Sequence, residues 1–183
     1  IPKNLPPISS LLSGYFSYDV IRYIEKIPNS CKDDLKIPDA RILRPRTLII
    51  HDNYQQKIYY IINCFADEKI SNYKKKYISI ENQINNLIFI SNYNSNFVTD
   101  SFKEKINVKS NISKNKFLQN VIKAKKYIKV GDIFQVVLSQ RFEAKLTKNP
   151  IEIYKKLRIN NPSPFMYFFN FHDFQIIGAS PEI

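Results

Sequence analysis

The chain has 183 residues, of which 44% are apolar and 24% are charged. These fractions are ordinary for a globular protein and exclude a disordered tail, a collagen-like fibre and a disulfide-stapled miniprotein. No stretch of the sequence approaches the ~18 uninterrupted apolar residues of a membrane-spanning helix.

The net charge is +12, and it comes from 22 Lys and 6 Arg against 16 acidic residues. Phosphate recognition usually depends on Arg, whose guanidinium group binds in a bidentate manner. The Lys residues are scattered, and the abundant Ile and Asn share A/T-rich codons with Lys. We therefore assign the charge to ordinary solvated faces and predict no nucleic-acid partner and no membrane partner.

Cysteine usage and the two ends of the chain bear on the compartment. Cys31 and Cys64 occur without a C-x-x-C motif or a histidine at metal-ligand spacing, so we expect reduced thiols in a cytoplasmic protein. The first residues, I-P-K-N-L-P-P, lack the apolar region of a signal peptide. Because the chain begins without Met and stops just after S-P-E, we interpret it as a fragment of a longer protein.

In the first half, residues 1–13 predict a loop and residues 14–19 a short strand. Val20, Ile21, Ile24 and Ile27 share a helical face, which predicts a helix over 20–27 that Pro28 ends. Residues 41–51 predict a strand with Pro45 at an edge or bulge, paired with a second strand over 57–65. Residues 70–87 have apolar residues at three- and four-residue spacing, Tyr73 and Tyr77 among them, and predict an amphipathic helix that contributes to a core.

Residues 91–112 are polar and non-periodic, and we place the internal boundary there, between residues 1–112 and 113–183. A helix is predicted over 117–128 with Gly131 as its C-terminal cap, followed by a strand over 133–142. Asn149-Pro150 predicts the start of a helix over 150–159. The last two predicted strands form a hairpin through His172-Asp173. Antiparallel hairpins mixed with helices indicate an α+β fold.

The sequence lacks the common catalytic motifs. With three glycines there is no P-loop and no G-x-G-x-x-G cradle, and neither H-E-x-x-H nor G-x-S-x-G occurs. His51-Asp52 and His172-Asp173 fall at predicted turns, where Asp is favoured for turn geometry. By itself the chain therefore predicts no self-contained active site.

Three segments are unusual: G-D-I-F-Q-V-V-L-S-Q-R-F at 131–142, N-P-S-P-F-M-Y-F-F at 161–169, and G-A-S-P-E at 178–182. The polar residues Gln135, Ser139 and Gln140 interrupt a core-like strand. They are either hydrogen-bonded inside the protein or form the solvated face of an edge strand. The proline loop either lines an apolar pocket or is a stiff crossover packed on the core.

Together these three segments resemble the chorismate-utilising enzymes, and within them the large subunits (component I) of anthranilate synthases. G-Y-F-S-Y-D at 14–19 and Pro38-Asp39-Ala40 resemble upstream motifs of the same family. Isochorismate and salicylate synthases carry a water-activating Lys at the position of Gln135, and an amide cannot act as a base. This makes Gln135 a possible residue near the active site of an enzyme whose nucleophile is ammonia.

The resemblance implies a lyase that converts chorismate and ammonia to anthranilate and pyruvate with Mg²⁺, in L-tryptophan biosynthesis. The implied partner is a glutamine amidotransferase subunit (component II), and L-tryptophan is the feedback inhibitor. It implies two packed antiparallel sheets with outer helices, of which this chain is an incomplete part, so apolar sheet edges are expected to be exposed. The catalytic residues and the Mg²⁺ ligands of the family are expected after Glu182, so 113–183 is the first part of the chorismate-binding catalytic domain and no catalytic residue is assigned.

One site is implied within the chain. The family binds tryptophan partly through a P-Y-M triplet, which matches Pro164, Phe165 and Met166, with Phe165 in place of the usual Tyr. The other half is an L-L-E-S motif, which we expect before Ile1, since Leu11-Leu12-Ser13 lacks the Glu. We therefore expect weak or no tryptophan binding by this chain.

Three other functions remain open at this stage. Aminodeoxychorismate synthase component I, of the folate pathway, is the nearest enzyme, but it usually departs from V-V-L-S-Q and S-P-F-M. A non-catalytic amino-acid-sensing module would use the N-P-S-P-F-M pocket alone. A small nucleic-acid-binding domain would need Lys and aromatic residues on one face and binding that falls steeply with salt.

Overall fold

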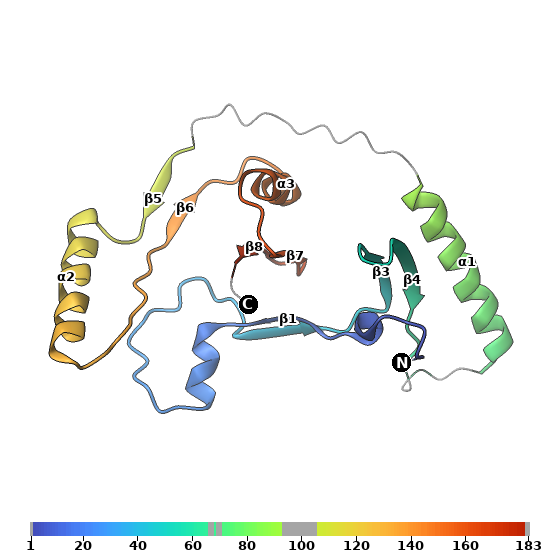
Figure 1. The fold of residues 1–183 in the computed structure, drawn as a ribbon, viewed down its shortest axis with the longest axis horizontal. Coiled ribbons are helices and arrows are strands. Elements are labelled where there is room, and N and C mark those ends of the chain that lie inside the picture. Colours follow the sequence, from blue (N-terminus) through green and yellow to red (C-terminus); the bar gives the residue numbers. More distant parts are fainter. Residues whose placement is uncertain (1, 66–67, 69–70, 93–105, 182–183) are drawn as a thin grey trace. The chain divides into compact units, whose positions relative to one another are not determined.

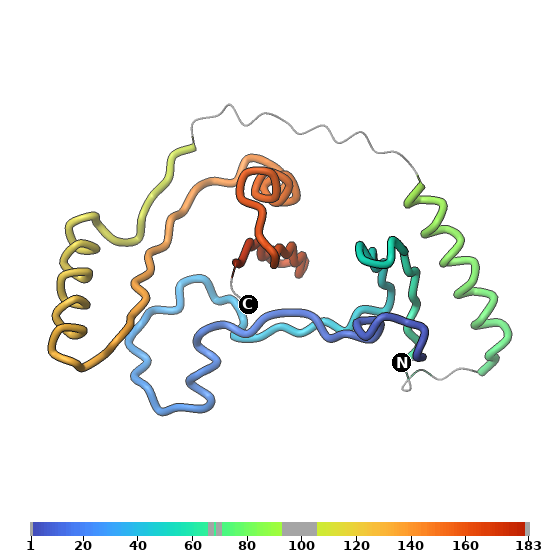
Figure 2. Tube along the Cα trace, in the orientation of Figure 1, coloured from blue at the N-terminus to red at the C-terminus, as the bar shows by residue number. Residues whose placement is uncertain are grey.

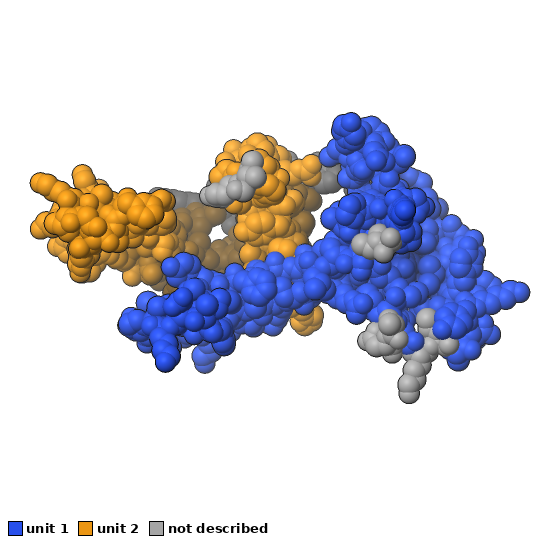
Figure 3. Space-filling view, turned by 60° about the horizontal axis from the view of Figure 1, so that its bottom comes forward, with its two compact units in different colours: residues 1–96 blue, residues 97–183 orange. Residues whose placement is uncertain are grey.

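The computed structural model describes residues 2–65, 68, 71–92 and 106–181. The chain divides into two units, Ile1–Asn96 and Phe97–Ile183, which Figure 3 colours blue and orange. The described strands pair only in antiparallel twos, β1 with β2, β3 with β4, β5 with β6 and β7 with β8. Helices are interspersed with these antiparallel strands along the chain (Figure 1), so the predicted α+β class is confirmed.

The first unit begins with a 3₁₀ turn at Pro7–Ser10 and the strand β1, Ser13–Phe16, which pairs with β2, Ala40–Leu43. Between them the predicted helix over 20–27 is wrong, because the segment is a 3₁₀ helix, Tyr18–Tyr23. The residue before this helix and its last residue are held by Asp39, which accepts hydrogen bonds from Ser17 Oγ at 3.3 Å and Tyr23 Oη at 3.0 Å. Because both ends of this six-residue segment are held, it forms the tighter i→i+3 hydrogen bonds of a 3₁₀ helix.

The predicted strand over 41–51 is divided in two by Pro45, since proline cannot donate to a β-ladder. β2 ends at Leu43, and the second part is β3, Thr47–Asp52, which pairs with β4, Lys57–Ile62. At the break, Asn63 Nδ2 donates to the carbonyl oxygens of Ser9 at 3.0 Å and Pro45 at 3.3 Å. This amide joins the N-terminal loop, the break and the end of β4.

Helix α1, Tyr73–Ser91, confirms the predicted helix and contacts β4. Its N-cap is Asn72, whose side chain accepts a hydrogen bond from Lys75 N at 2.9 Å. The prediction that Tyr73 and Tyr77 contribute to a core is wrong, because these side chains are 76% and 67% exposed. The half-buried apolar residues of the helix are Ile80, Ile84 and Leu87.

A charged cluster around Glu68 joins Arg46, the residue before β3, to the first turn of α1. Glu68 accepts from Phe65 N at 2.9 Å, and its carboxylate pairs with Lys76 Nζ at 3.1 Å and Arg46 Nη2 at 3.0 Å. These bonds, the backbone one foremost, lower the pKa of Glu68 from 4.5 to about 2. The guanidinium of Arg44 lies 3.8 Å above the Phe65 ring, which adds a cation–π contact to the cluster.

The second unit contains α2, Lys114–Val130, whose N-cap is Ser113. The predicted C-terminal cap is confirmed, because Gly131 takes the left-handed conformation (φ +86°). The predicted strand over 133–142 is wrong, because only its end is paired. The short β6, Phe142–Ala144, pairs with β5, Val108–Ser110, whereas 133–140 form no ladder with other described residues. A strand sequence without a neighbour for its N–H and C=O groups does not become a strand.

Helix α3, Pro150–Asn160, contacts both strands of the predicted hairpin, β7, Phe165–Asn170, and β8, Gln175–Ser180. Asn149 caps the helix by accepting from Ile151 N at 3.1 Å. The tube in Figure 2 follows the chain through this helix and hairpin to the C-terminal end. In the predicted linker, 93–105 lie outside the described residues, and 108–110 form β5.

The described apolar side chains are mostly accessible, and only Ile61 of β4 and Phe171 after β7 are buried among them. Phe134, Val137 and Val130 are 94%, 82% and 70% exposed. In the part of the chain that the structure describes, no helix has the length and hydropathy needed to cross a membrane.

A substitution at Gly14 tests the β1–β2 pair. Gly14 pairs with Ile42, and a Cβ added at Gly14 would overlap the carbonyl oxygen of Arg41, a backbone atom that cannot swing aside. We expect Gly14→Ala to cost about 1–3 kcal/mol, as overpacked sites do, and to raise amide exchange over 13–16 and 40–43. Ser13→Ala, one residue away, is the control and should change the same exchange by no more than about 0.5 kcal/mol. Unchanged protection in Gly14→Ala would contradict the register.

Acid sensitivity tests the Glu68 cluster. Because the pKa of Glu68 is lowered from 4.5 to about 2, its contribution to stability is present above pH 4.5 and is lost as pH falls through 2. We expect the urea midpoint, followed by far-UV circular dichroism, to fall between pH 4.5 and 2, and to fall less in Glu68→Gln. Glu81→Gln, at an exposed position of α1, is the matched control and should keep the full acid dependence. If the urea midpoint of Glu68→Gln fell with pH as much as that of the unchanged chain, the contribution of the Glu68 cluster to stability would be contradicted.

Candidate functional site

The proline loop that connects α3 to β7 is built by local bonds. Asn161 closes the helix by donating its backbone N–H to Leu157 O at 2.8 Å. Ser163 Oγ then donates to Phe165 O at 3.2 Å across the second proline. Since prolines fix φ at 162 and 164, these bonds give the loop one defined path into the strand. Pro164 is exposed at the point where β7 begins.

Phe165 and Met166 lie on opposite faces of the hairpin, because successive strand residues alternate. Met166 shares its face with Phe168, whose ring lies 5.9 Å from the Tyr154 ring of α3. Phe165 shares the other face with Tyr167, and these two side chains are 47% and 39% exposed. The structure therefore brings Pro164, Phe165 and Met166 together along the backbone but turns Met166 to the helix and Phe165 to the open face.

Gly178 of β8 lies opposite Tyr167 and allows the tyrosine ring to cover it. A Cβ at position 178 would overlap the Tyr167 ring, so a glycine is what leaves room for this contact. Tyr167 also lies beside Phe169, with ring centroids 5.7 Å apart. The predicted segment 178–182 is thus the strand β8 up to Ser180, and its glycine supports an aromatic row on the open face.

Gln135 lies in the segment between α2 and β6, and its side chain is exposed. The β7–β8 hairpin, which carries Phe165, packs on α3, whereas Gln135 lies in the segment after α2. Of its polar neighbours, Gln140 has a described contact, because its Oε1 accepts from Ser110 Oγ at 3.3 Å. A role for Gln135 near the active site, and for residues 164–166 in effector binding, is implied by the family resemblance alone.

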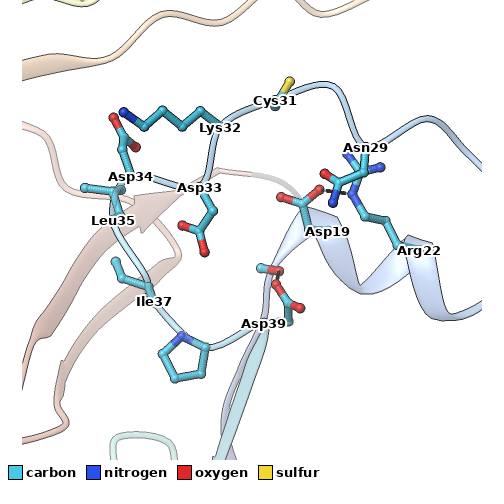
Figure 4. A pocket seen from close by; sticks show the side chains of 12 residues that line it. Asp19, Arg22, Asn29, Cys31, Lys32, Asp33, Asp34, Leu35, Ile37 and Asp39 are labelled. Atoms are coloured by element: carbon cyan, nitrogen blue, oxygen red, sulfur yellow. Dashed lines mark hydrogen bonds and ion pairs between the residues drawn. The ribbon is translucent and has the colours of Figure 1, made fainter.

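A cavity of about 450 Å³ in the first unit was not predicted from the sequence. It lies inside the loop between the 3₁₀ helix and β2, and Asp33 points into it (Figure 4). On its rim Arg22 Nε binds Asp19 at 2.7 Å, and Arg22 Nη1 donates to Pro28 O at 2.6 Å. The hydrogen bond and charge of Asp39 raise the pKa of Tyr23 above 10.0. The loop is closed by Asp39, which accepts from Ser17 Oγ and Tyr23 Oη, and no local sequence pattern signals these contacts.

The described side chains do not fit a Mg²⁺ site. A hard cation needs several oxygen ligands at one point, and no group of three or more His, Cys, Asp or Glu residues capable of holding a metal ion occurs among them. The carboxylates of the first-unit cavity are therefore surface acids, with Asp19 and Asp39 engaged by Arg22, Ser17 and Tyr23.

Comparison with known proteins gives a consistent match. A family described as chorismate binding enzymes matches residues 2–183. Anthranilate synthase component 1 of Acetivibrio thermocellus is 40% identical over 98% of this chain and 37% of its own length. The chloroplastic anthranilate synthase alpha subunit 1 of Arabidopsis thaliana is 33% identical over 93% of this chain and 30% of its own length.

A solved structure agrees with these matches. Anthranilate synthase component I from Streptococcus pneumoniae superposes with a TM-score of 0.80 and 33% identity over 96% of this chain. The match covers 39% of that protein. The chain therefore spans between a third and two fifths of the length of most of these relatives.

A pair of substitutions tests which face of the β7–β8 hairpin packs on α3. We expect Met166→Ala to weaken the packing of the hairpin on α3 by about 2 kcal/mol, the lower end of the range for a methionine that is only partly buried. Phe165→Ala removes an exposed ring and should change stability by no more than about 0.5 kcal/mol. Amide exchange in β7 and β8 measures both. If Phe165→Ala lowered the protection of these amides more than Met166→Ala, the assignment of the two faces would be reversed.

Proposed function

Because the chain belongs to the family of chorismate-binding enzymes, we propose that it is the part of an anthranilate synthase large subunit that carries the effector loop and the start of the catalytic domain. The observation that carries this proposal is the identity of 35–40% that four bacterial proteins, each named anthranilate synthase component 1, share with nearly the whole chain. The reaction is the conversion of chorismate and ammonia to anthranilate and pyruvate, in tryptophan biosynthesis.

The use of ammonia is supported by Gln135. A carboxamide has no basic group that could deprotonate water, so a reaction at this position needs a nucleophile that is already basic, as ammonia is. The ammonia would come from a glutamine amidotransferase subunit, the component 2 that the name of the relatives presupposes. Aminodeoxychorismate synthase component I would use the same nucleophile, and the product distinguishes the two enzymes.

The effector site is proposed at Pro164, Phe165 and Met166. Phe165 has no hydroxyl, so L-tryptophan bound here would be held by backbone groups of the rigid loop and by contact with the ring. Ser163 and the prolines fix that backbone before any ligand arrives, which lowers the entropic cost of binding. The Glu-containing half of the site is proposed to come from outside the chain, so we expect this chain to bind tryptophan weakly or not at all.

Mg²⁺ is proposed as the cofactor of the whole enzyme, with its ligands in segments outside residues 1–183. The cation would supply charge stabilisation to an acidic substrate as its hydroxyl group departs. Cys31 and Cys64 are exposed free thiols, which supports a reducing compartment such as the cytoplasm.

A chimera tests the proposed function. Residues 1–183 replace the aligned segment of the Acetivibrio thermocellus component 1, and anthranilate fluorescence is measured with chorismate, ammonium and Mg²⁺. We expect anthranilate to form, and Gln135→Lys to lower kcat at least about tenfold, since a cation replaces a neutral amide, a change of ~1.4 kcal/mol or more. Gln135→Asn, which keeps the amide, is the control and should retain more activity than Gln135→Lys. A folded chimera that yields 4-amino-4-deoxychorismate, or no aminated product, would refute the assignment.

A further inference from the structure

Helix α2 concentrates positive charge without any negative charge of its own. Six of its 17 residues are lysines and none is acidic. Helix α1 pairs Lys76 with Glu68 at 3.1 Å, and α3 pairs Lys155 with Glu152 at 2.7 Å. By contrast, no α2 lysine forms an ion pair with another residue that the structure describes.

This charge opposes the formation of the helix. Lys114 and Lys116 lie in its first turn, where the helix dipole is positive and cations are disfavoured. Lys125 and Lys129 are four residues apart, a spacing at which like charges repel each other. A row of negative charges along the helix would therefore relieve a repulsion that the described residues leave in place.

One side of α2 is covered within the second unit. Ala124 and Tyr127 line a cavity of about 220 Å³ together with Ile133, Val136 and Leu138, which follow the helix in the chain. At 3.6 residues per turn, the opposite side of the helix carries six residues, which are all exposed. We call this side the outer face, and its residues are Lys114, Leu118, Ile122, Lys125, Lys126 and Lys129.

The outer face has an apolar half and a cationic half. Leu118 and Ile122 are 49% and 57% exposed and lie one turn apart. Lys125 and Lys129 continue the same row, so that the four residues follow one another at spacings of four, three and four. This is the spacing along which one helix packs against another.

We propose that the outer face of α2 is a docking site for an acidic amphipathic helix of a partner protein. Apolar side chains of that helix would cover Leu118 and Ile122, and its carboxylates would pair with Lys125, Lys126 and Lys129. An amphipathic helix recognised by a row of side chains at this spacing is a recurrent binding mode, and opposite charge selects the partner. The inference rests neither on the proposed reaction nor on the effector site.

The face fits other occupants less well. A single-stranded nucleic acid is bound by aromatic side chains and Arg, whereas α2 has no Arg and its aromatic residues, Phe117 and Tyr127, are absent from the outer face. A membrane would need the apolar side of the helix, but Phe117, Val121 and Ala124 of that side are half-buried. Two copies of this chain would bring lysines together, which disfavours self-association.

A labelled peptide tests the outer face. Residues 1–183 replace the aligned segment of the Acetivibrio thermocellus component 1, so that the rest of the fold is present. The probe is a fluorescein-labelled helical peptide with two leucines in one half and glutamates at the same spacing in the other. We expect fluorescence anisotropy to show binding that weakens as salt rises, and a peptide with glutamines for the glutamates to bind at least about tenfold more weakly.

Two double variants form a matched pair, because each removes two positive charges from α2. Lys125→Gln with Lys129→Gln changes the outer face and should weaken binding of the glutamate peptide about tenfold. Lys116→Gln with Lys123→Gln changes the side towards the cavity and should weaken it by less than about threefold, since these charges act only through the general field. Lys125→Arg with Lys129→Arg keeps both charges and should bind as the unchanged chimera does. Far-UV circular dichroism follows the helix in each variant.

Several outcomes would overturn the proposal. These are no binding by the chimera, equal binding of the glutamate and glutamine peptides, equal weakening in the two Gln variants, and loss of binding in the Arg variant. A uridine oligonucleotide and phosphatidylserine vesicles are the competing probes. If either bound more tightly than the peptide and lost that binding in Lys125→Gln with Lys129→Gln, the outer face would serve a nucleic acid or a membrane instead.

Discussion

Backbone hydrogen bonding between strands is the constraint on which this structure depends. Each described sheet has two strands, so every strand has one edge outside any described ladder. A two-stranded sheet is marginally stable in water unless another element covers one of its faces. The two hairpins that have a helix against them, β3–β4 with α1 and β7–β8 with α3, are also where the two buried apolar residues, Ile61 and Phe171, are found.

Each of these two hairpins therefore packs against a helix. In β7 the alternation of side chains turns Met166 and Phe168 to α3 and leaves Phe165 and Tyr167 on the accessible face. Outside the hairpins, hydrogen bonds and charge replace apolar packing. The amide of Asn63 and the carboxylate of Glu68 each join three segments of the first unit.

Local signals predicted the elements that need no distant partner. Gly131 caps α2 in the left-handed conformation, Asn149 caps α3, and the turn at His172, with φ +72°, closes the last hairpin. The errors occurred where a distant residue decides the structure. Asp39 holds both ends of the 3₁₀ helix found where a helix over 20–27 was expected, and most of the strand expected over 133–142 has no described neighbour. The loop cavity near Asp33 could not be predicted, because its closure depends on contacts between residues some twenty positions apart.

Position 135 shows the same dependence on distant residues. Gln135 lies in a segment that forms no ladder with other described residues, and its side chain is exposed. Because a hydrogen-bonded ladder is what assigns a strand residue to one face of a sheet, the local sequence alone does not fix the direction of this amide.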